Sequence, residues 1–317
     1  QKMIGTDVSK AANLLLAGEL VAIPTETVYG LAANALDASA VSKIYNAKQR
    51  PSFNPLIVHI ANTDEVLKYV TEFSPLARQL AEAFWPGSLT ILMPKNDAVP
   101  DLVTAGLPNV ALRVPKHPLT LQLLSLLNFP LAAPSANISN TVSPTNARRV
   151  DQSLGDTVSY ILDGGKCDVG VESTIVSVIE NQVTLLREGG ISKEQIEAEL
   201  GVNVCTQADE KITAPGQLKK HYATQKPLFL VDDMQDALLR YQTEKVSVLL
   251  FNKIETTENQ IPYLLSSDYN LSEIANNLFE TMHLADEDNS EFILAERCKN
   301  EGIGRAINDR LLRASVR

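Results

Sequence analysis

The sequence predicts two α/β domains, of which the first is about twice as large as the second. Three observations support this fold class. The chain has 317 residues and is 44% hydrophobic, which exceeds the usual single domain and suffices for packed cores. Apolar segments of strand length alternate with amphipathic segments of helix length. Residues 206–227 lose this periodicity and contain two prolines and a glycine, as linkers do. We therefore expect a first domain over residues 1–205, a linker, and a small α/β domain over residues 228–317.

The first domain opens with a predicted helix over residues 9–18 and a strand over residues 20–23. Ser9 is a cap or first-turn residue of this helix, and Gly18 ends it. The strand ends at Pro24. Polar residues at a strand exit often face a site, and four follow here before the turn at Gly30: Thr25, Glu26, Thr27 and Tyr29.

The next helix begins at its cap, Asp37, and ends in the run KQRPSFNPLIVH, residues 48–59. Pro51 and Pro55 fix φ and hold the residues before them extended. The loop leads into a strand over residues 56–60 and carries four polar candidates, Lys48, Arg50, Asn54 and His59. Two interpretations are open: a binding loop for an anionic substrate, or a charged helix end whose cations complement the helix dipole.

Arg113 interrupts the apolar run of a strand over residues 110–115. An unpaired buried charge costs several kcal/mol, so this arginine should face either a carboxylate or an anionic ligand. The elements before and after it are helices over residues 62–70, 74–85 and 117–128 and a strand over residues 89–94. Trp85 is predicted to lie in the core.

The segment PLAAPSANISNTVSPT, residues 130–145, combines small residues with hydroxyl and amide groups. Small side chains let a ligand approach the backbone, while Ser135, Asn137 and Ser143 can form hydrogen bonds with it. Ser143 precedes Pro144 and is predicted to cap a helix over residues 146–155, whose N-terminus could receive a phosphate. An ordinary capped helix would explain Ser143 but not the SAN cluster.

Alternating strands and helices complete both domains. In the first domain they are strands over residues 158–163, 172–179 and 185–190 and a helix over residues 192–201. In the second they are strands near residues 227–231, 246–251, 263–267 and 292–297 and helices near residues 237–242, 271–284 and 306–315, a pattern that predicts a small parallel sheet. GIGRAI, residues 302–307, has Ile307 where a dinucleotide fingerprint has its third glycine, so we interpret it as a strand-to-helix turn.

Composition argues against several classes of protein. The net charge is −10, and acidic residues outnumber basic ones in both halves of the chain, so direct nucleic-acid binding should be weak or absent. Cys167, Cys205 and Cys298 are far apart and form no CxxC pair, which argues against disulfides and a zinc site. No run of about 18 apolar residues occurs. We expect a soluble, cytoplasmic protein without membrane association.

The sequence contains no P-loop, no nucleophile elbow and no Cys/His nucleophile pair. What remains is four cations and several loops of small hydroxyl residues that could hold phosphate oxygens. The cations are Lys48, Arg50, Arg113 and Arg187. This combination suits nucleotidyl transfer, because that chemistry needs in-line positioning and charge neutralisation more than a protein nucleophile.

A series of motifs resembles, in order and spacing, the YrdC-type threonylcarbamoyl-AMP synthases. The motifs are PTETVYGL, the K-x-R pair with RPSFNPLIVH, FWPG, LRVP, PSANIS followed by SPT, and VESTIV. The linker APGQLKKHYA and the α/β tail resemble the longer, two-domain branch of that family. The resemblance implies an open twisted α/β sheet with a large concave cavity, followed by a smaller Rossmann-like α/β domain.

The resemblance also implies an activity. Such an enzyme is a nucleotidyltransferase that condenses L-threonine, bicarbonate and ATP to threonylcarbamoyl-AMP and pyrophosphate, for the threonylcarbamoyladenosine modification of tRNA. Mg²⁺ would enter with ATP without ligands from protein side chains, and no tightly bound organic cofactor is expected. The product would pass to the tRNA threonylcarbamoyl transferase machinery.

The same resemblance assigns roles to residues. The catalytic set would be Lys48, Arg50, Ser135 and Asn137. The threonine side would be formed by Thr27, His59, Arg113 and Ser173. The residues around ATP would be Lys48, Arg50, Asn54, Ser135, Ser143, Arg187 and Tyr222. Tyr222 lies in the linker, which would act as a lid over the nucleotide.

The chain departs from the family pattern at Ser88, Asn140, Ser177, Glu188, Gln217 and Thr224. Glu188 matters most, because an acidic group beside Arg187 could weaken its hold on phosphate. Two rival functions follow from the same fold. One is a double-stranded RNA or nucleotide-binding module without synthase activity, which the acidic charge disfavours. The other is a carbamoyl-handling maturation factor, whose zinc fingers the three cysteines cannot supply.

Overall fold

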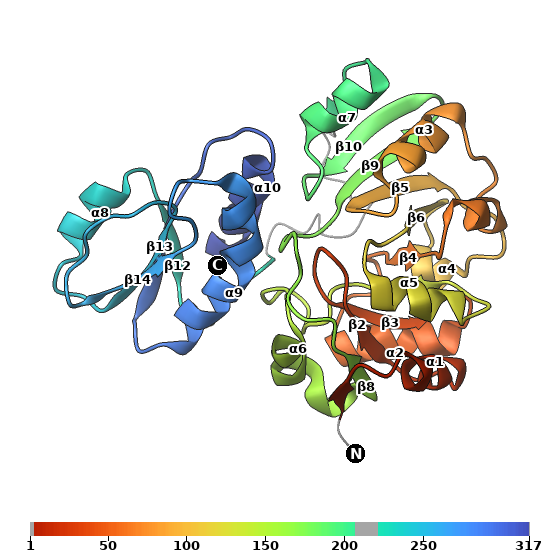
Figure 1. Cartoon of the computed structure of the whole chain (residues 1–317), viewed down its shortest axis with the longest axis horizontal. Helices are drawn as coiled ribbons and strands as arrows, with labels where there is room; N and C mark the ends of the chain where they lie inside the picture. Colours follow the sequence, from red (N-terminus) through yellow and green to blue (C-terminus); the bar gives the residue numbers. More distant parts are fainter. Residues whose placement is uncertain (1–2, 207–220, 317) are drawn as a thin grey trace.

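The computed structural model describes residues 3–206 and 221–316, and it forms two α/β bodies (Figure 1). The larger sheet ends with β11 (Cys205–Thr206), and the smaller one begins with β12 (Leu228–Val231). Most of the predicted linker, residues 207–220, lies outside the described residues. Within the described part of the chain, no helix is long and apolar enough to cross a membrane.

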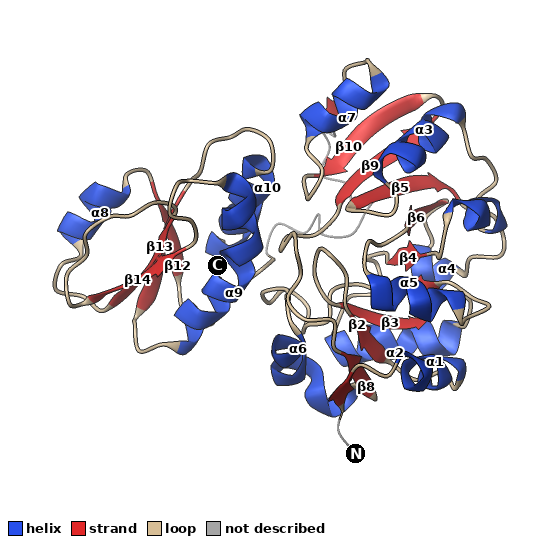
Figure 2. Cartoon of the chain, in the orientation of Figure 1, coloured by secondary structure: helices blue, strands red, loops and turns tan. Residues whose placement is uncertain are grey.

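The larger body is built on a mixed, open sheet of eleven strands within the described residues, in the order β1-β8-β2-β3-β7-β4-β6-β5-β9-β10-β11. Its other strands are β1 (Ile4–Gly5), β2 (Val21–Ile23), β3 (Gly30–Asn34), β4 (Ile57–His59), β5 (Leu89–Pro94), β6 (Asn109–Arg113), β7 (Leu131–Ala132), β8 (Tyr160–Leu162), β9 (Thr174–Ile179) and β10 (Gln182–Arg187). Its helices are α1 (Val8–Leu16), α2 (Ala38–Lys48), α3 (Pro75–Phe84), α4 (Asp101–Thr104), α5 (Pro118–Ser125), α6 (Ala147–Leu154) and α7 (Lys193–Leu200), with 3₁₀ turns η1 (Thr63–Lys68) and η2 (Gly155–Thr157). Figure 2 shows these helices around the strands.

Helix caps follow the local sequence, with one correction. Asp37 caps α2 as predicted. Asp7 caps α1, because its carboxylate accepts the Lys10 N–H, and Ser9 is a first-turn residue, the second of its two predicted roles. Asn146, not Ser143, caps α6, so the prediction that Ser143 caps this helix is wrong. The segment predicted as a helix over residues 62–70 forms only the 3₁₀ turn η1.

The core of the larger body fixes the strands that carry the site. Tyr29, Leu31, Ile44 and Leu56 are almost fully buried within one apolar cluster. Trp85 is buried with them, as predicted, and its indole N–H donates to the Leu89 carbonyl at 2.7 Å. Strands β4 and β6 are parallel and in register, so their last residues, His59 and Arg113, lie opposite each other at the same edge of the sheet.

The smaller body has four parallel strands in the order β12-β15-β13-β14, so the predicted parallel α/β layer is confirmed. Its remaining elements are β13 (Val246–Leu250), β14 (Gln260–Leu264), β15 (Phe292–Glu296), α8 (Met234–Arg240), α9 (Leu271–Glu287) and α10 (Gly304–Ser315). Helix α8 packs on one face of this sheet, and α9 and α10 cover the face toward the larger body (Figure 1). The first two residues of the GIGRAI motif lead into α10, and its last four form the start of that helix.

Candidate active site

One pocket at the strand ends gathers residues from seven separate segments of the chain. Its empty volume, including its mouth, is about 580 Å³. Eight of the twelve residues predicted from the sequence line it: Thr27, Arg50, His59, Arg113, Ser135, Ser173, Arg187 and Tyr222. The other four, Lys48, Asn54, Asn137 and Ser143, are buried and do not line this pocket. The pocket walls therefore mix guanidinium groups with small hydroxyl side chains.

Lys48 lies behind the wall and holds the SAN loop in place. It is 1% exposed, and its Nζ donates to the carbonyls of Ser135 at 2.6 Å and Asn137 at 2.5 Å. Burial lowers the pKa of Lys48 well below its usual value, and the nearby Arg50 lowers it further. The side-chain oxygen of Asn137 is buried without a hydrogen-bond partner. Lys48 thus joins the end of α2 to the loop that carries two of the predicted catalytic residues.

Arg50 keeps the KQRPSFNPL loop folded around its own side chain. Its Nε donates to the Asn54 carbonyl at 3.2 Å and its Nη2 to the Pro55 carbonyl at 2.8 Å. Burial lowers the pKa of Arg50 to about 10, so it remains a cation at neutral pH. Lys48 bonds to the SAN loop and Arg50 to its own loop, and the described hydrogen bonds of both go elsewhere than to the last carbonyls of α2, which disfavours the helix-end interpretation. The amide of Asn54 is buried with neither polar atom paired.

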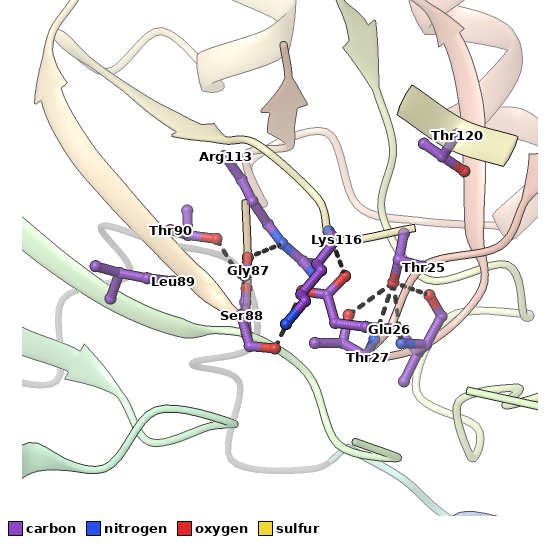
Figure 3. Close-up of polar contacts among 12 residues, drawn as sticks. Thr25, Glu26, Thr27, Gly87, Ser88, Leu89, Thr90, Arg113, Lys116 and Thr120 are labelled. Carbon is purple, nitrogen blue, oxygen red and sulfur yellow. Dashed lines mark hydrogen bonds and ion pairs between the residues drawn. The ribbon is translucent and has the colours of Figure 1, made fainter. Parts of the chain in front are cut away.

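The sequence left open whether Arg113 faces a carboxylate or an anionic ligand. In the structure it pairs with a carboxylate and also lines the pocket. Its Nη2 lies 2.6 Å from Glu26 Oε1, and both side chains are about 5% exposed or less. Glu26 also accepts hydrogen bonds from Ser88 Oγ and from the Lys116 N–H. Figure 3 shows this cluster at the end of β6. Ser88, one of the departures from the family pattern, therefore helps to hold the Glu26 carboxylate.

The pKa of Glu26 reflects these contacts. Burial alone would raise it, but the charge and hydrogen bond of Arg113 outweigh burial and lower it below its usual value. Glu26 was not selected as a site residue from the sequence. Its position in the polar run after the first strand was the signal available.

The rest of this wall is formed by small polar groups. The hydroxyls of Thr25 and Thr27 lie 2.8 Å apart, and those of Thr90 and Ser173 also lie 2.8 Å apart. The Nδ1 atom of His59 is buried without a partner. Burial, followed by the charge of Arg113, lowers the pKa of His59 to about 3. His59 is therefore a neutral ring at pH 7, next to a buried cation.

A second carboxylate, Glu172, lines the pocket and organises the residues around it. Its Oε1 accepts the Ser143 hydroxyl at 2.7 Å and its Oε2 accepts Arg310 Nε at 2.9 Å. Burial would raise the pKa of Glu172, but Arg310, Arg187 and the Ser143 hydrogen bond lower it to about 2. The Ser143 hydroxyl thus donates to this carboxylate instead of capping α6, which is why the cap prediction failed.

Arg187 and Glu188 point to different partners. Arg187 donates from Nε and Nη2 to the Ser173 carbonyl, at 3.0 and 2.8 Å, and burial lowers its pKa to about 10. The Glu188 carboxylate instead pairs with Arg305 at 3.1 Å. The expectation that Glu188 could weaken Arg187 therefore finds no support in their geometry.

His221 and Tyr222 close the pocket from the end of the linker. Tyr222 is 1% exposed and stacks on Phe279 of α9, with ring centroids 5.3 Å apart. The N–H of the following residue, Ala223, donates to the Asn140 carbonyl at 2.7 Å. Asn140 has a left-handed φ of 69°, a conformation that asparagine tolerates better than most residues. This explains how a non-glycine residue fits at that departure from the family pattern.

His221 was noticed in the sequence only as a large residue in a linker. Its Nδ1 is buried without a partner, and burial lowers its pKa to about 3. Glu172 raises that pKa, while Arg50, Lys48 and Arg310 lower it. The described pocket therefore holds two neutral histidines among its cations.

These histidines predict an acid-sensitive fold. The unfolded chain protonates histidine near pH 6.5, but the folded chain does not until about pH 3. Stability should therefore fall as pH drops below about 6.5, with His221 alone accounting for about 2 kcal/mol between pH 7 and pH 5. Urea unfolding of the wild type and the His221→Asn variant at both pH values measures this. The variant should lose part of the pH dependence at an unchanged m-value; equal pH dependence in both proteins would contradict the buried, neutral state of His221.

A pocket of buried cations, paired carboxylates and unpartnered polar atoms, at the edge of an open α/β sheet, defines an enzyme site for small polar and anionic substrates. Comparison with protein families adds the particular group. Residues 13–189 match the family described as "Telomere recombination" (Sua5, YciO and YrdC), and residues 191–316 match the threonylcarbamoyl-AMP synthase C-terminal domain. The chain belongs to the threonylcarbamoyl-AMP synthase family.

Individual relatives cover nearly the whole chain. A threonylcarbamoyl-AMP synthase of Bacillus subtilis is 42% identical over 97% of this chain and 92% of its own length. One from Pyrococcus abyssi is 38% identical over 96% of this chain and 93% of its own. A solved structure of P. abyssi Sua5 in complex with L-threonine matches with a TM-score of 0.89 and 37% identity, over 97% of this chain and 94% of that one. The resemblance found in the sequence, including its two-domain form, is confirmed.

Proposed function

We propose that this chain condenses L-threonine, bicarbonate and ATP to threonylcarbamoyl-AMP and pyrophosphate, and that the product serves the threonylcarbamoyladenosine modification of tRNA. The observation that carries the proposal is the single pocket that brings together eight of the predicted residues. Family membership and the threonine complex of the P. abyssi relative support it. In this proposal the reaction takes place in the cytoplasm, and the tRNA threonylcarbamoyl transferase machinery takes the product.

The wall formed by Thr27, His59, Arg113 and Ser173 suits an amino acid. Arginine carries five N–H donors, and the described hydrogen bonds of Arg113 to Gly87 and Glu26 leave donors for a threonine carboxylate. The neutral ring of His59 adds no positive charge that would repel the threonine amine. The neighbouring hydroxyls can both donate and accept, as recognition of the threonine side chain requires.

The wall with Arg50 and Arg187 suits a triphosphate, since guanidinium groups bind phosphate with strong, charge-assisted hydrogen bonds. Within the described residues, no group of three or more histidine, cysteine, aspartate or glutamate side chains could hold a metal ion. Glu172, which lines the pocket, and Glu26, which lies behind Arg113, are both paired with arginines. This donor set fits the proposal that Mg²⁺ enters on the phosphates of ATP and there helps to neutralise their charge.

The chemistry would run in two steps. The threonine nitrogen forms a bond to the carbon of bicarbonate with loss of water, which gives a carbamate. A carbamate oxygen then attacks the α-phosphorus of ATP in line, and the bond from this phosphorus to the bridging oxygen breaks as pyrophosphate leaves. Arg50 and Lys48 would stabilise the charge that develops on the α-phosphate and the leaving group.

The test is pyrophosphate release measured with all three substrates and with each one left out. We expect release only when L-threonine, bicarbonate and ATP are all present, with threonylcarbamoyl-AMP identified by mass spectrometry. Release that does not need threonine would overturn the proposal. Binding of double-stranded RNA without any release would favour the rival RNA-binding function.

A further inference from the structure

The second domain contributes a fully buried arginine to the nucleotide side of the site. Arg310 lies on α10 and is 0% exposed. Its Nε donates to Glu172 Oε2 at 2.9 Å, and its Nη2 donates to the Glu188 carbonyl at 2.8 Å. Both acceptors belong to the first domain. Arg310 therefore reaches across the domain interface and pairs with a carboxylate that lines the pocket.

Glu172 transmits this contact to residues of the proposed ATP site. Its second oxygen holds the Ser143 hydroxyl, and its charge interacts with that of Arg187. The Arg310 guanidinium also lies over the Tyr222 ring, 5.4 Å from its centroid. The Arg310 guanidinium thus contacts the Tyr222 ring directly, and it acts on Ser143 and Arg187 through Glu172. All three are residues assigned to ATP.

The domain interface around Arg310 is closely fitted. A Cβ on Gly170, whose φ is +80°, would lie 2.5 Å from the Cα of Asn276 on α9. Arg305, five residues before Arg310 on α10, pairs with Glu188 and Glu194. Neither arginine lines the pocket, but in the described hydrogen bonds only Arg310 contacts Glu172, whereas Arg305 does not. The two arginines therefore share a helix and an interface but differ in their connection to the site.

The charge balance indicates what Arg310 does. Without it, the Glu172 carboxylate would lie unpaired at the pocket, where it would repel a triphosphate and compete with that triphosphate for Arg187. With it, the carboxylate is neutralised and oriented, and Ser143 is fixed by the other oxygen. Because a triphosphate carries several negative charges and threonine carries no net charge, the effect should fall mainly on ATP.

We propose that Arg310 is a positioning residue of the ATP site, which acts by pairing with Glu172, so that the second domain completes the nucleotide side of the pocket. This inference rests on the proposed function, because it assigns the Glu172 wall to ATP. It assigns Arg310 no contact with the reacting atoms.

The test compares Arg310→Met with Arg305→Met, which breaks an interface ion pair away from the pocket. We expect Arg310→Met to raise the KM for ATP about tenfold or more while the KM for threonine changes less than about threefold, whereas Arg305→Met changes neither beyond about threefold. The double variant Glu172→Gln/Arg310→Met, which has no unpaired carboxylate, should recover part of the loss for ATP. If Arg310 only helped the two domains to dock, both arginine variants would instead change the KM values for ATP and for threonine to the same extent.

Equal effects of the two single variants, or equal rises in both KM values, would overturn the inference. If Arg310→Met does not fold, Arg310→Lys decides, because it keeps the charge but loses the fixed geometry. A selective rise in the KM for ATP supports the inference, and unchanged kinetics overturn it. Calorimetric titration of ATP into the wild type and the variants separates the two proposals. A wild type that binds ATP but forms no threonylcarbamoyl-AMP removes the proposed function, while weaker ATP binding by the Arg310 variant still supports its role.

Discussion

The Lys48→Ala variant should lose turnover by a factor on the order of 100 or more. The reason is that Lys48 combines two roles in the structure. Its ammonium group holds the carbonyls of Ser135 and Asn137, and its charge lies close to Arg50. Removing it would release the SAN loop and take away an ammonium group from behind the wall of the proposed α-phosphate site.

The measurement is pyrophosphate release at saturating substrates, together with thermal unfolding of each variant. Lys48→Met keeps most of the side-chain volume, so it separates the loss of the ammonium group from the creation of a cavity. Lys43→Met is the matched control, because Lys43 lies on the same helix but forms a half-exposed ion pair with Glu19. Near-wild-type turnover in folded Lys48→Met would show that the ammonium group has no part in the chemistry.

The Arg113→Met variant should be less stable by about 3 to 5 kcal/mol, because removing one partner of a buried ion pair leaves the other charge unpaired. That partner is Glu26, which is 4% exposed and which, in the described hydrogen bonds, then keeps Ser88 and the Lys116 N–H as its donors. The same variant should also lose measurable threonine binding. Urea unfolding and calorimetric titration with L-threonine measure the two effects.

A double variant, Glu26→Gln/Arg113→Met, distinguishes the two roles of Arg113. It should recover part of the lost stability, because no charge is left unpaired, but it should not recover threonine binding. If the double variant binds threonine as tightly as the wild type, Arg113 serves only the ion pair.

The stability lost in the Arg113→Met variant should depend on pH. In the wild type the pKa of Glu26 is lowered, so the pair stabilises the fold above about pH 4.5, the value of the unfolded chain. Without Arg113, burial raises the pKa of Glu26 above that of the unfolded chain, and the variant loses stability as pH rises. The difference between the two proteins should therefore be larger at pH 8 than at pH 5.

The elements and most of the pocket could be predicted from the sequence because their signals are local. The Asp37 carboxylate caps α2 by accepting from N–H groups within three residues of it. The alternation of apolar segments identified most strands of both sheets, but β1, β3, β7 and β11 were not predicted. Motif order then placed residues as distant as Thr27 and Tyr222 in one site, and both line the pocket. The domain boundaries at residues 205 and 228 stay predictions.

The errors and omissions at the site share one physical cause, which is long-range pairing. Ser143 has the local features of a cap, but Glu172, 29 residues away, takes its hydroxyl, and Asn146 caps the helix instead. The partner of Arg113 is 87 residues away, and Arg310 reaches Glu172 over 138 residues. No spacing rule connects such positions, so Glu172 and Arg310 could be recognised only from the folded chain.

The stacking of Tyr222 on Phe279 is one of several contacts that join the second domain to the rest of the chain. Val28, Val142 and Val171 of the first domain share one apolar cluster with α9 and α10, and Arg149 of α6 finds its carboxylate partners, Glu280 and Glu287, on α9. A chain cut after the first domain would expose this apolar surface and leave Arg149 without its partners on α9. We therefore expect the two domains, although distinct in topology, to unfold together as one unit.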